Sequence, residues 1–188
     1  MTVRKQPPLP FNVASFICSS PALRCAVLLL VALAVCFPRT TTWRPATEEE
    51  LKDIIPARAP VEKERIETEF RTASGVIGPN GKYLAGVVLI TAGYSAEGKY
   101  SHFVTTGVPV KIGNFSLRPG EYVFGSRHDG DALAVKFYEA QSGRYVGTVD
   151  ATRQSRIGKI ESFHIAPSGD HGIIEIGRFG FVYQVSQP

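Results

Sequence analysis

Two glycine-rich stretches of the 188-residue chain place a histidine close to an aspartate. His128 and Asp131 lie in one stretch, and Asp170 and His171 lie in the other. Histidine and aspartate side chains ligate transition metals, and a bound metal ion activates water for hydrolysis. Because such a site needs three or four convergent ligands, neither stretch suffices by itself. These four residues are therefore candidate metal ligands of a metal-dependent hydrolase, on the condition that the two stretches meet in space.

The first stretch also fits the turn of a β-hairpin. Asp129-Gly130 is a preferred central pair of a two-residue hairpin loop, because both central positions adopt positive φ. His128 and Asp131 would then flank the turn as paired neighbours. A calcium loop would need further acidic ligands and a longer excursion of the chain. The sequence favours the hairpin over a metal site.

Other catalytic signatures are missing from the sequence. The three cysteines are Cys18, Cys25 and Cys36, so the chain beyond them has no thiol nucleophile or thiolate ligand. It has no G-x-S-x-G motif, phosphate-binding loop or dinucleotide fingerprint. We therefore expect a non-enzymatic protein with no catalytic residues and no cofactor.

Aromatic side chains offer a second kind of site. Tyr94, Tyr100 and Tyr138 are candidates for a platform that binds carbohydrate or peptide, since tyrosine combines a flat apolar ring with a hydroxyl. The alternative, which the strand pattern favours, is that these rings pack against neighbours across a sheet. His102 and His164 also fall in predicted strands, where each is expected to have only a local partner.

The elements that must position these residues are predicted β-strands. From residue 62 onward apolar and polar residues alternate, as at Leu133, Val135 and Phe137. Turn signals containing glycine, proline or asparagine recur about every ten residues. The sequence predicts an all-β fold over residues 62–188, either an antiparallel β-sandwich or a small barrel, with eight to ten strands.

The N-terminal region has a different character. Residues 25–37 are uniformly apolar and follow a segment with basic residues and no acidic ones. The stretch is shorter than the about 20 residues of a membrane-spanning helix and is typical of a secretory signal. We predict that residues 1–37 form a hydrophobic leader helix that serves as a signal peptide or a membrane anchor. The cysteine at position 36 adds lipid attachment as a further alternative.

Residues 38–61 are predicted to be a linker with one short helix. Thr47 followed by Glu50 matches a capping box, and Pro56 would end the helix. The helix is interpreted as a spacer between the leader and the domain. Docking of this helix on the domain or on a partner is the alternative.

The charge balance argues against a nucleic-acid partner. The chain has 21 basic and 17 acidic residues, but three of the basic ones lie in the first 36 positions. The rest of the chain holds 18 basic and 17 acidic residues, which is too even for a nucleic-acid surface. We expect contact with a membrane only through the N-terminal segment.

Two stretches carry a resemblance to known modules. The sequence NFSLRPGEYVFG over residues 114–125 has an apolar strand, a Pro-Gly turn and an aromatic strand. This arrangement resembles prealbumin-like and carboxypeptidase-regulatory-like β-sandwich modules. Residues 161–185 are similar to small exported bacterial β-domains of unknown function. The resemblance implies an exported β-sandwich that acts as an accessory or binding module, and it supplies no catalytic residues.

Together these observations predict a non-catalytic exported β-domain with a binding or structural role. It would be periplasmic, extracellular or anchored in the membrane by its N-terminal segment, with a protein or carbohydrate of the cell envelope as partner. Two alternatives stay open. One is a β-barrel that binds a small ligand in its interior, and the other is the metal-dependent hydrolase that uses both His-Asp turns.

Overall fold

The computed structural model describes residues 42–155, 160–169 and 171–185. The leader helix predicted over residues 1–37, and with it the signal or anchor, lies outside this range. Within the described ranges no helix is both long and apolar enough to cross a membrane.

The described chain folds into strands with one α-helix and one 3₁₀ helix. The helical elements are α2 (Glu48–Ile54) and η1 (Pro79–Gly81). The strands, in chain order, are β1 (Arg44–Pro45), β2 (Arg58–Val61), β3 (Glu64–Ile77), β4 (Tyr83–Leu89), β5 (His102–Thr106), β6 (Val110–Ile112), β7 (Phe115–Leu117), β8 (Gly120–Asp129), β9 (Ala132–Glu139), β10 (Tyr145–Arg153), β11 (His164–Ser168), β12 (His171–Ile176) and β13 (Phe179–Val185).

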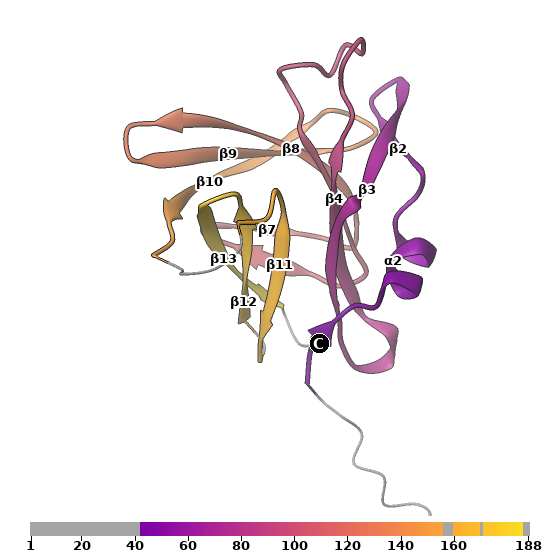
Figure 1. Ribbon diagram of the computed structural model, residues 1–188, viewed down its shortest axis with the longest axis vertical. Coiled ribbons are helices and arrows are strands. Elements are labelled where there is room, and N and C mark those ends of the chain that lie inside the picture. Colours follow the sequence, from indigo (N-terminus) through magenta and orange to yellow (C-terminus); the bar gives the residue numbers. More distant parts are fainter. Residues whose placement is uncertain (1–41, 156–159, 170, 186–188) are drawn as a thin grey trace, which may run out of the picture. The chain divides into compact units, whose positions relative to one another are not determined.

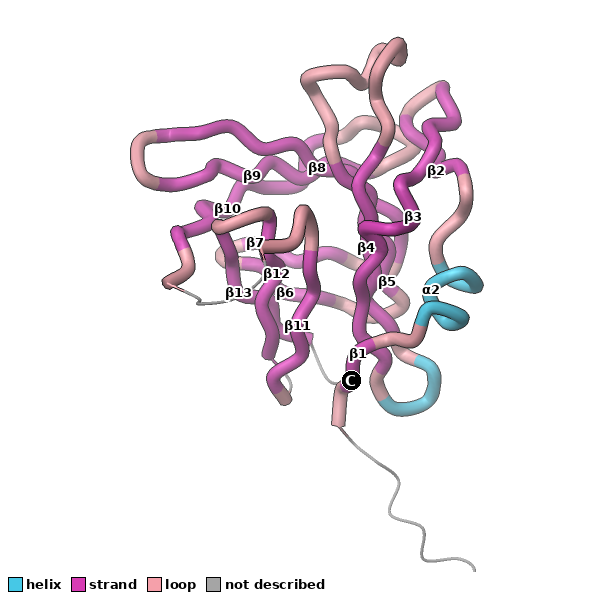
Figure 2. Tube along the Cα trace, in the orientation of Figure 1, coloured by secondary structure: helices cyan, strands magenta, loops and turns pink. Residues whose placement is uncertain are grey.

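These strands form one antiparallel sheet that is nearly closed into a barrel (Figures 1 and 2). The hydrogen-bonded order is β1-β3-β4-β5-β8-β9-β10-β13-β12-β11, with β2 beside β3 and with β6 between β13 and β7. The predicted all-β antiparallel fold is confirmed. The described sheet has thirteen strands instead of eight to ten. The excess arises because β1, β6 and β7 are only two or three residues long, too short to show alternation in the sequence.

Side chains pack into two apolar cores, one on each face of the curved sheet. Neighbouring residues of β5 show the division, since Val104 belongs to the inner core and Phe103 to the outer core. The inner core receives side chains from β4, β5, β8, β9, β12 and β13 and so fills the barrel. The outer core lies between the wall of β3, β4, β5 and β8 and the segment with α2 and β2, which contributes Leu51, Ile55 and Val61.

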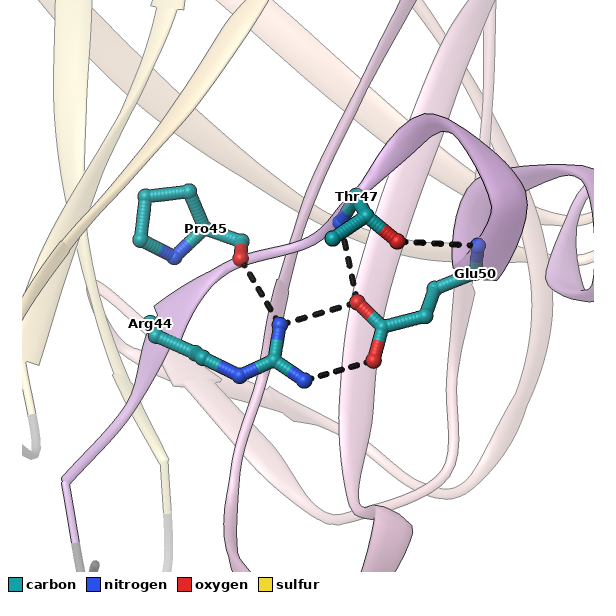
Figure 3. A network of polar contacts seen from close by, with 4 residues as sticks. All are labelled: Arg44, Pro45, Thr47 and Glu50. Atoms are coloured by element: carbon teal, nitrogen blue, oxygen red, sulfur yellow. Dashed lines mark hydrogen bonds and ion pairs between the residues drawn. The ribbon is translucent and has the colours of Figure 1, made fainter.

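A polar network fixes the start of helix α2 (Figure 3). The Glu50 N–H donates to the Thr47 hydroxyl at 3.3 Å, and the Thr47 N–H donates to the Glu50 carboxylate at 2.9 Å. These two bonds are the predicted capping box. Arg44 donates to both oxygens of the same carboxylate at 2.6 and 2.8 Å. The hydrogen bonds from Arg44, together with the one from the Thr47 backbone N–H, lower the pKa of Glu50 to about 2.

Residues 42–61 belong to the folded domain and are not a linker. Trp43 is part of the inner core and Leu51 of the outer core, while Ala59 is fully buried in β2. β2 also pairs with β3 along its whole length. The boundary predicted at residue 62 is therefore too late. The segment passes from strand to helix to strand within a few residues, which leaves no periodicity long enough to detect.

The hairpin predicted around His128 is present, but its register differs by one residue. Asp129 pairs with Ala132, so the two-residue loop is Gly130-Asp131, and His128 lies opposite Leu133. Gly130 has a φ of 59°, whereas Asp131 does not have positive φ. This pattern is typical of a type II′ turn, in which glycine takes the first central position. His128 and Asp131 are therefore not paired neighbours across the turn.

The barrel is closed along a seam between β3 and β11. No backbone ladder joins these two strands in the described sheet, although they lie side by side. At the seam the Ile165 N–H in β11 donates to the Ser74 hydroxyl in β3 at 2.9 Å. The pairing of β3 with β4 shifts register between Glu69 and Ser74, which makes a bulge in β3 beside the seam. A bond from backbone to side chain therefore takes the place of a ladder bond at this point.

Phe163 precedes β11 and holds the seam from the inside. Its side chain is only 3% exposed and lies over Gly86 in β4, where an added Cβ would be 2.8 Å from the ring. Its ring centroid is 5.2 Å from that of His102 and 6.2 Å from that of Phe124. Gly86 is needed here because any side chain at this position would displace the Phe163 ring.

We expect Phe163→Ala to lower the free energy of unfolding by about 3–5 kcal/mol, since a large buried ring is lost and a cavity is left. Phe179→Ala is the matched control, because Phe179 is only half-buried. Its expected loss is about half as large. Urea unfolding of both variants measures the difference, and equal losses would contradict the special role of Phe163.

Candidate functional site

The structure does not bring the two His-Asp turns together. The His128 ring packs edge-on against Phe179 at 5.4 Å, at the start of β13. His171 pairs with Gln184, near the other end of the same strand. Five strand positions separate these points by about 17 Å. Asp170 lies outside the described residues, and among those described no group of three or more His, Cys, Asp or Glu side chains is arranged to hold a metal. The geometry of the described residues thus gives the hydrolase hypothesis no support.

The candidate tyrosines form a packed row and not an open platform. Tyr100 is buried and meets Tyr138 edge-to-face at 5.3 Å, and Tyr138 meets Tyr145 at 5.7 Å. The Tyr100 hydroxyl donates to the Glu62 carboxylate at 2.6 Å. Tyr94 is half-buried against the outer core. These contacts match the alternative of cross-strand packing, because the ring faces are used within the protein.

The barrel interior is filled by side chains. Phe124 and Phe137 have ring centroids 4.9 Å apart, and Phe137 and Phe181 have centroids 5.9 Å apart. A small closed barrel is just wide enough to be filled in this way. The packed interior therefore gives no support to the hypothesis of a small ligand inside the barrel. The outer wall, in contrast, carries a groove.

A groove of about 450 Å³ runs along the seam on this wall. Helix α2, the end of β1 and the bulge of β3 form one side, and the segment that leads into β11 forms the other. The lining consists of Pro45, Ala46, Leu51, residues 71–75 and residues 160–165. Ile160 stands at the rim with 51% of its surface exposed. The groove thus combines apolar side chains with the edge of a bulged strand.

Three polar side chains meet in this groove. His164 Nδ1 lies 3.2 Å from a Glu161 carboxylate oxygen and 3.4 Å from Ser74 Oγ. Ser74 Oγ also accepts the N–H of Ile165 at the seam. Serine, histidine and glutamate are the residue types of a hydrolytic triad, in which their relative geometry decides whether they can act together.

The geometry does not fit a catalytic relay. A relay requires the hydroxyl and the carboxylate on opposite ring nitrogens, so that one nitrogen takes the proton while the other is held. Here both Ser74 and Glu161 contact Nδ1 of His164. Ser74 is thus better suited to join β3 to β11 than to attack a substrate.

Sequence reasoning missed this cluster. Ser74 and His164 are 90 positions apart, and only closure of the sheet brings them together. The local pattern placed His164 in a strand, but no local signal could show that Ser74 lies beside it.

His102 lies immediately behind the groove wall. Its ring stacks on Phe124 with centroids 4.6 Å apart and planes 6° apart, and its Nδ1 is 2.8 Å from Ser101 Oγ. Its Nε2 is buried and has no hydrogen-bond partner among the described residues. Burial lowers the pKa of His102 to about 4. Tyr100, two positions earlier, precedes β5 and belongs to the outer core, so it does not share the face of His102.

The neutral form of His102 is strongly favoured in this position. Burial lowers the pKa from 6.5 to about 4, which corresponds to about 3 kcal/mol against the charged form. The cause is the loss of hydration in the buried position.

A second hollow, of about 470 Å³, lies over β6, β10, β12 and β13. Val182 in its lining is 60% exposed. Its floor is formed mainly by β13, which pairs with β12, with β6 and, at its start, with β10. The described ladder between β10 and β13 covers only Thr152 and Arg153 of β10, so this hollow also lies beside an unpaired strand edge. The seam groove differs in that the Ser74, Glu161 and His164 side chains meet in it.

Comparisons of the chain with known protein families, with curated proteins and with solved structures found no match. The resemblance to prealbumin-like modules stays a prediction.

Removal of the Ser74 hydroxyl tests its role at the seam. We expect Ser74→Ala to lower the free energy of unfolding by about 1–3 kcal/mol, because the Ile165 N–H loses its acceptor. Ser162→Ala is the control, since Ser162 lines the same groove but is exposed. Hydrogen exchange at the Ile165 amide should become faster only in Ser74→Ala. Unchanged exchange in that variant would show that this bond does not hold the seam.

Proposed function

We propose that this domain is a non-catalytic binding module, and that its seam groove holds an extended segment of a partner polypeptide. The observation that carries the proposal is the edge of β3. This strand pairs with β2 over residues 64–67 and with β1 over residues 76–77. Between them, no described strand pairs with this edge of residues 69–74, and part of that stretch lines the groove.

An extended peptide suits a site of this composition. Peptides that add to a strand edge gain affinity from backbone hydrogen bonds and specificity from pockets for alternate side chains. Leu51 and Phe163 lie almost fully buried behind the lining, and Ile160 supplies an exposed apolar side chain at the rim. His164 and Arg71 place polar groups beside it, where they can select among partner side chains.

The sequence supports an exported location for this module. The apolar stretch over residues 25–37 ends close to the first described residue, and the chain then enters the domain at β1. Pro45 and Ala46 line the groove, so the site lies beside this entry point. A partner in the cell envelope fits both the signal and the anchor interpretation of the leader.

Site-specific photo-crosslinking in living cells tests the proposal. The full-length chain would carry p-benzoylphenylalanine in place of Ile160, at the rim of the groove. We expect a discrete adduct that mass spectrometry maps to one continuous segment of a single partner protein. The same substitution at Val182 is the control, because that side chain is at least as exposed but lies over the other hollow.

Two outcomes would contradict the proposal. An adduct at Val182 with none at Ile160 would place binding at the other hollow. An adduct at Ile160 that contains only carbohydrate would overturn the polypeptide partner.

The hydrolase alternative can be tested on the same protein. We expect no labelling of Ser74 by a fluorophosphonate, since its hydroxyl accepts a backbone hydrogen bond and no relay activates it. Intact mass before and after treatment provides the measurement. Labelling that disappears in Ser74→Ala would overturn the non-catalytic proposal.

A further inference from the structure

Phe163 connects the buried His102 to the seam groove. One side of the His102 ring stacks on Phe124, and the Phe163 ring lies 5.2 Å away at an interplanar angle of 47°. Phe163 also lines the groove, in the segment that forms the wall opposite the β3 bulge. The same side chain therefore shields His102 from water and supports one wall of the proposed site.

The surroundings of His102 do not accommodate a positive charge. Both ring nitrogens of a protonated imidazole are donors, and Nε2 faces no acceptor among the described residues. The only cause that shifts the pKa of His102 is burial, with no contribution from a charged neighbour. Phe163 is the aromatic neighbour of His102 that also lines the groove, so displacement of its ring would uncover that side of the imidazole.

Titratable groups on the packed elements do not change this picture. β4 carries Tyr83 alone. β8 carries Glu121 and the buried Tyr122 near its start, and Arg127, His128 and Asp129 in its exposed part. Beside Phe163, Glu161 and His164 contact each other on the groove side. This contact lies at the same seam, so any test must separate it from His102.

We propose that protonation of His102 displaces Phe163, opens the seam between β3 and β11, and releases the bound partner segment in acidic surroundings. Release follows because the groove loses one of its walls when residues 160–165 move. This regulation rests on the proposed function of the groove, but the opening itself involves no ligand.

The pH dependence of the opening follows from the difference between the His102 pKa in the closed seam and in the open seam. The pKa of His102 is about 4 in the closed seam and approaches the ordinary 6.5 once water reaches the ring. The closed state is therefore fully favoured above about pH 6.5 and loses its advantage as the pH falls towards 4. Between about pH 7.5 and pH 5 the opening equilibrium constant should rise by up to about thirtyfold.

Hydrogen exchange at the Ile165 amide measures the opening, because its N–H is bonded across the seam to Ser74. The full-length protein would be compared at about pH 7.5 and pH 5, with rates corrected for the intrinsic effect of pH. Three proteins are needed: the wild type, His102→Phe, which keeps a neutral ring on Phe124, and His164→Gln, which removes the imidazole from the groove. We expect the rise in the wild type and in His164→Gln, and a flat response in His102→Phe.

Any other result contradicts the proposal. A rise that persists in His102→Phe and vanishes in His164→Gln would assign the effect to the His164–Glu161 pair. Equal exchange at Ile165 and at Phe103, whose side chain lies in the outer core, would show global unfolding instead of local opening.

One measurement is independent of how well His102→Phe folds. In the wild type, NMR titration of the His102 ring should show protonation together with the loss of Ile165 protection. A ring that titrates near pH 6.5 while Ile165 stays protected would contradict the proposal.

The two proposals can fail separately. Exchange at Ile165 is measured without any partner, so it tests the opening alone. Crosslinking at Ile160 near pH 7.5 tests the binding site alone. If both succeed, crosslinking repeated near pH 5 should give a reduced yield, and an unchanged yield would show that opening does not release the partner.

Discussion

The contact of Phe163 with the bare backbone at Gly86 is the constraint on which the rest of this structure depends. A sheet that curves into a barrel normally closes by a ladder between its first and last strands. Here the last strand, β11, reaches β3 without such a ladder, and the Ile165–Ser74 bond spans the gap. Packing of the Phe163 ring on Gly86 therefore helps to keep the barrel closed.

Closure of this kind explains why the candidate site lies where it does. A continuous ladder would have left no free strand edge in the wall between β3 and β11. The bulge of β3 and the approach to β11 instead leave a groove between them. The residues that hold the barrel shut are also residues that line the groove, so the stability of the barrel is coupled to the shape of the proposed site.

The sequence predicted the local features well and the long-range ones poorly. Alternation at Leu133, Val135 and Phe137 identified a strand whose inner face is indeed buried. The capping box of Thr47 and Glu50 identified the only α-helix among the described residues, since capping depends on residues three positions apart. Pairing register is harder to predict, and Asp129 pairs one residue away from its expected place because Gly130 takes the first turn position. No local pattern could join Ser74 to His164, because their proximity results from the closed topology alone.

The place where the chain enters the domain has a mechanical consequence. β1 pairs with β3 through only Arg44 and Pro45, and Trp43 before it packs over Gly78. Tension applied through the N-terminal segment would load this short pairing before any other strand of the sheet. The first part to yield would then be the edge that borders the groove. A pull along the chain and a change at the wall of the proposed site would therefore act on the same few residues.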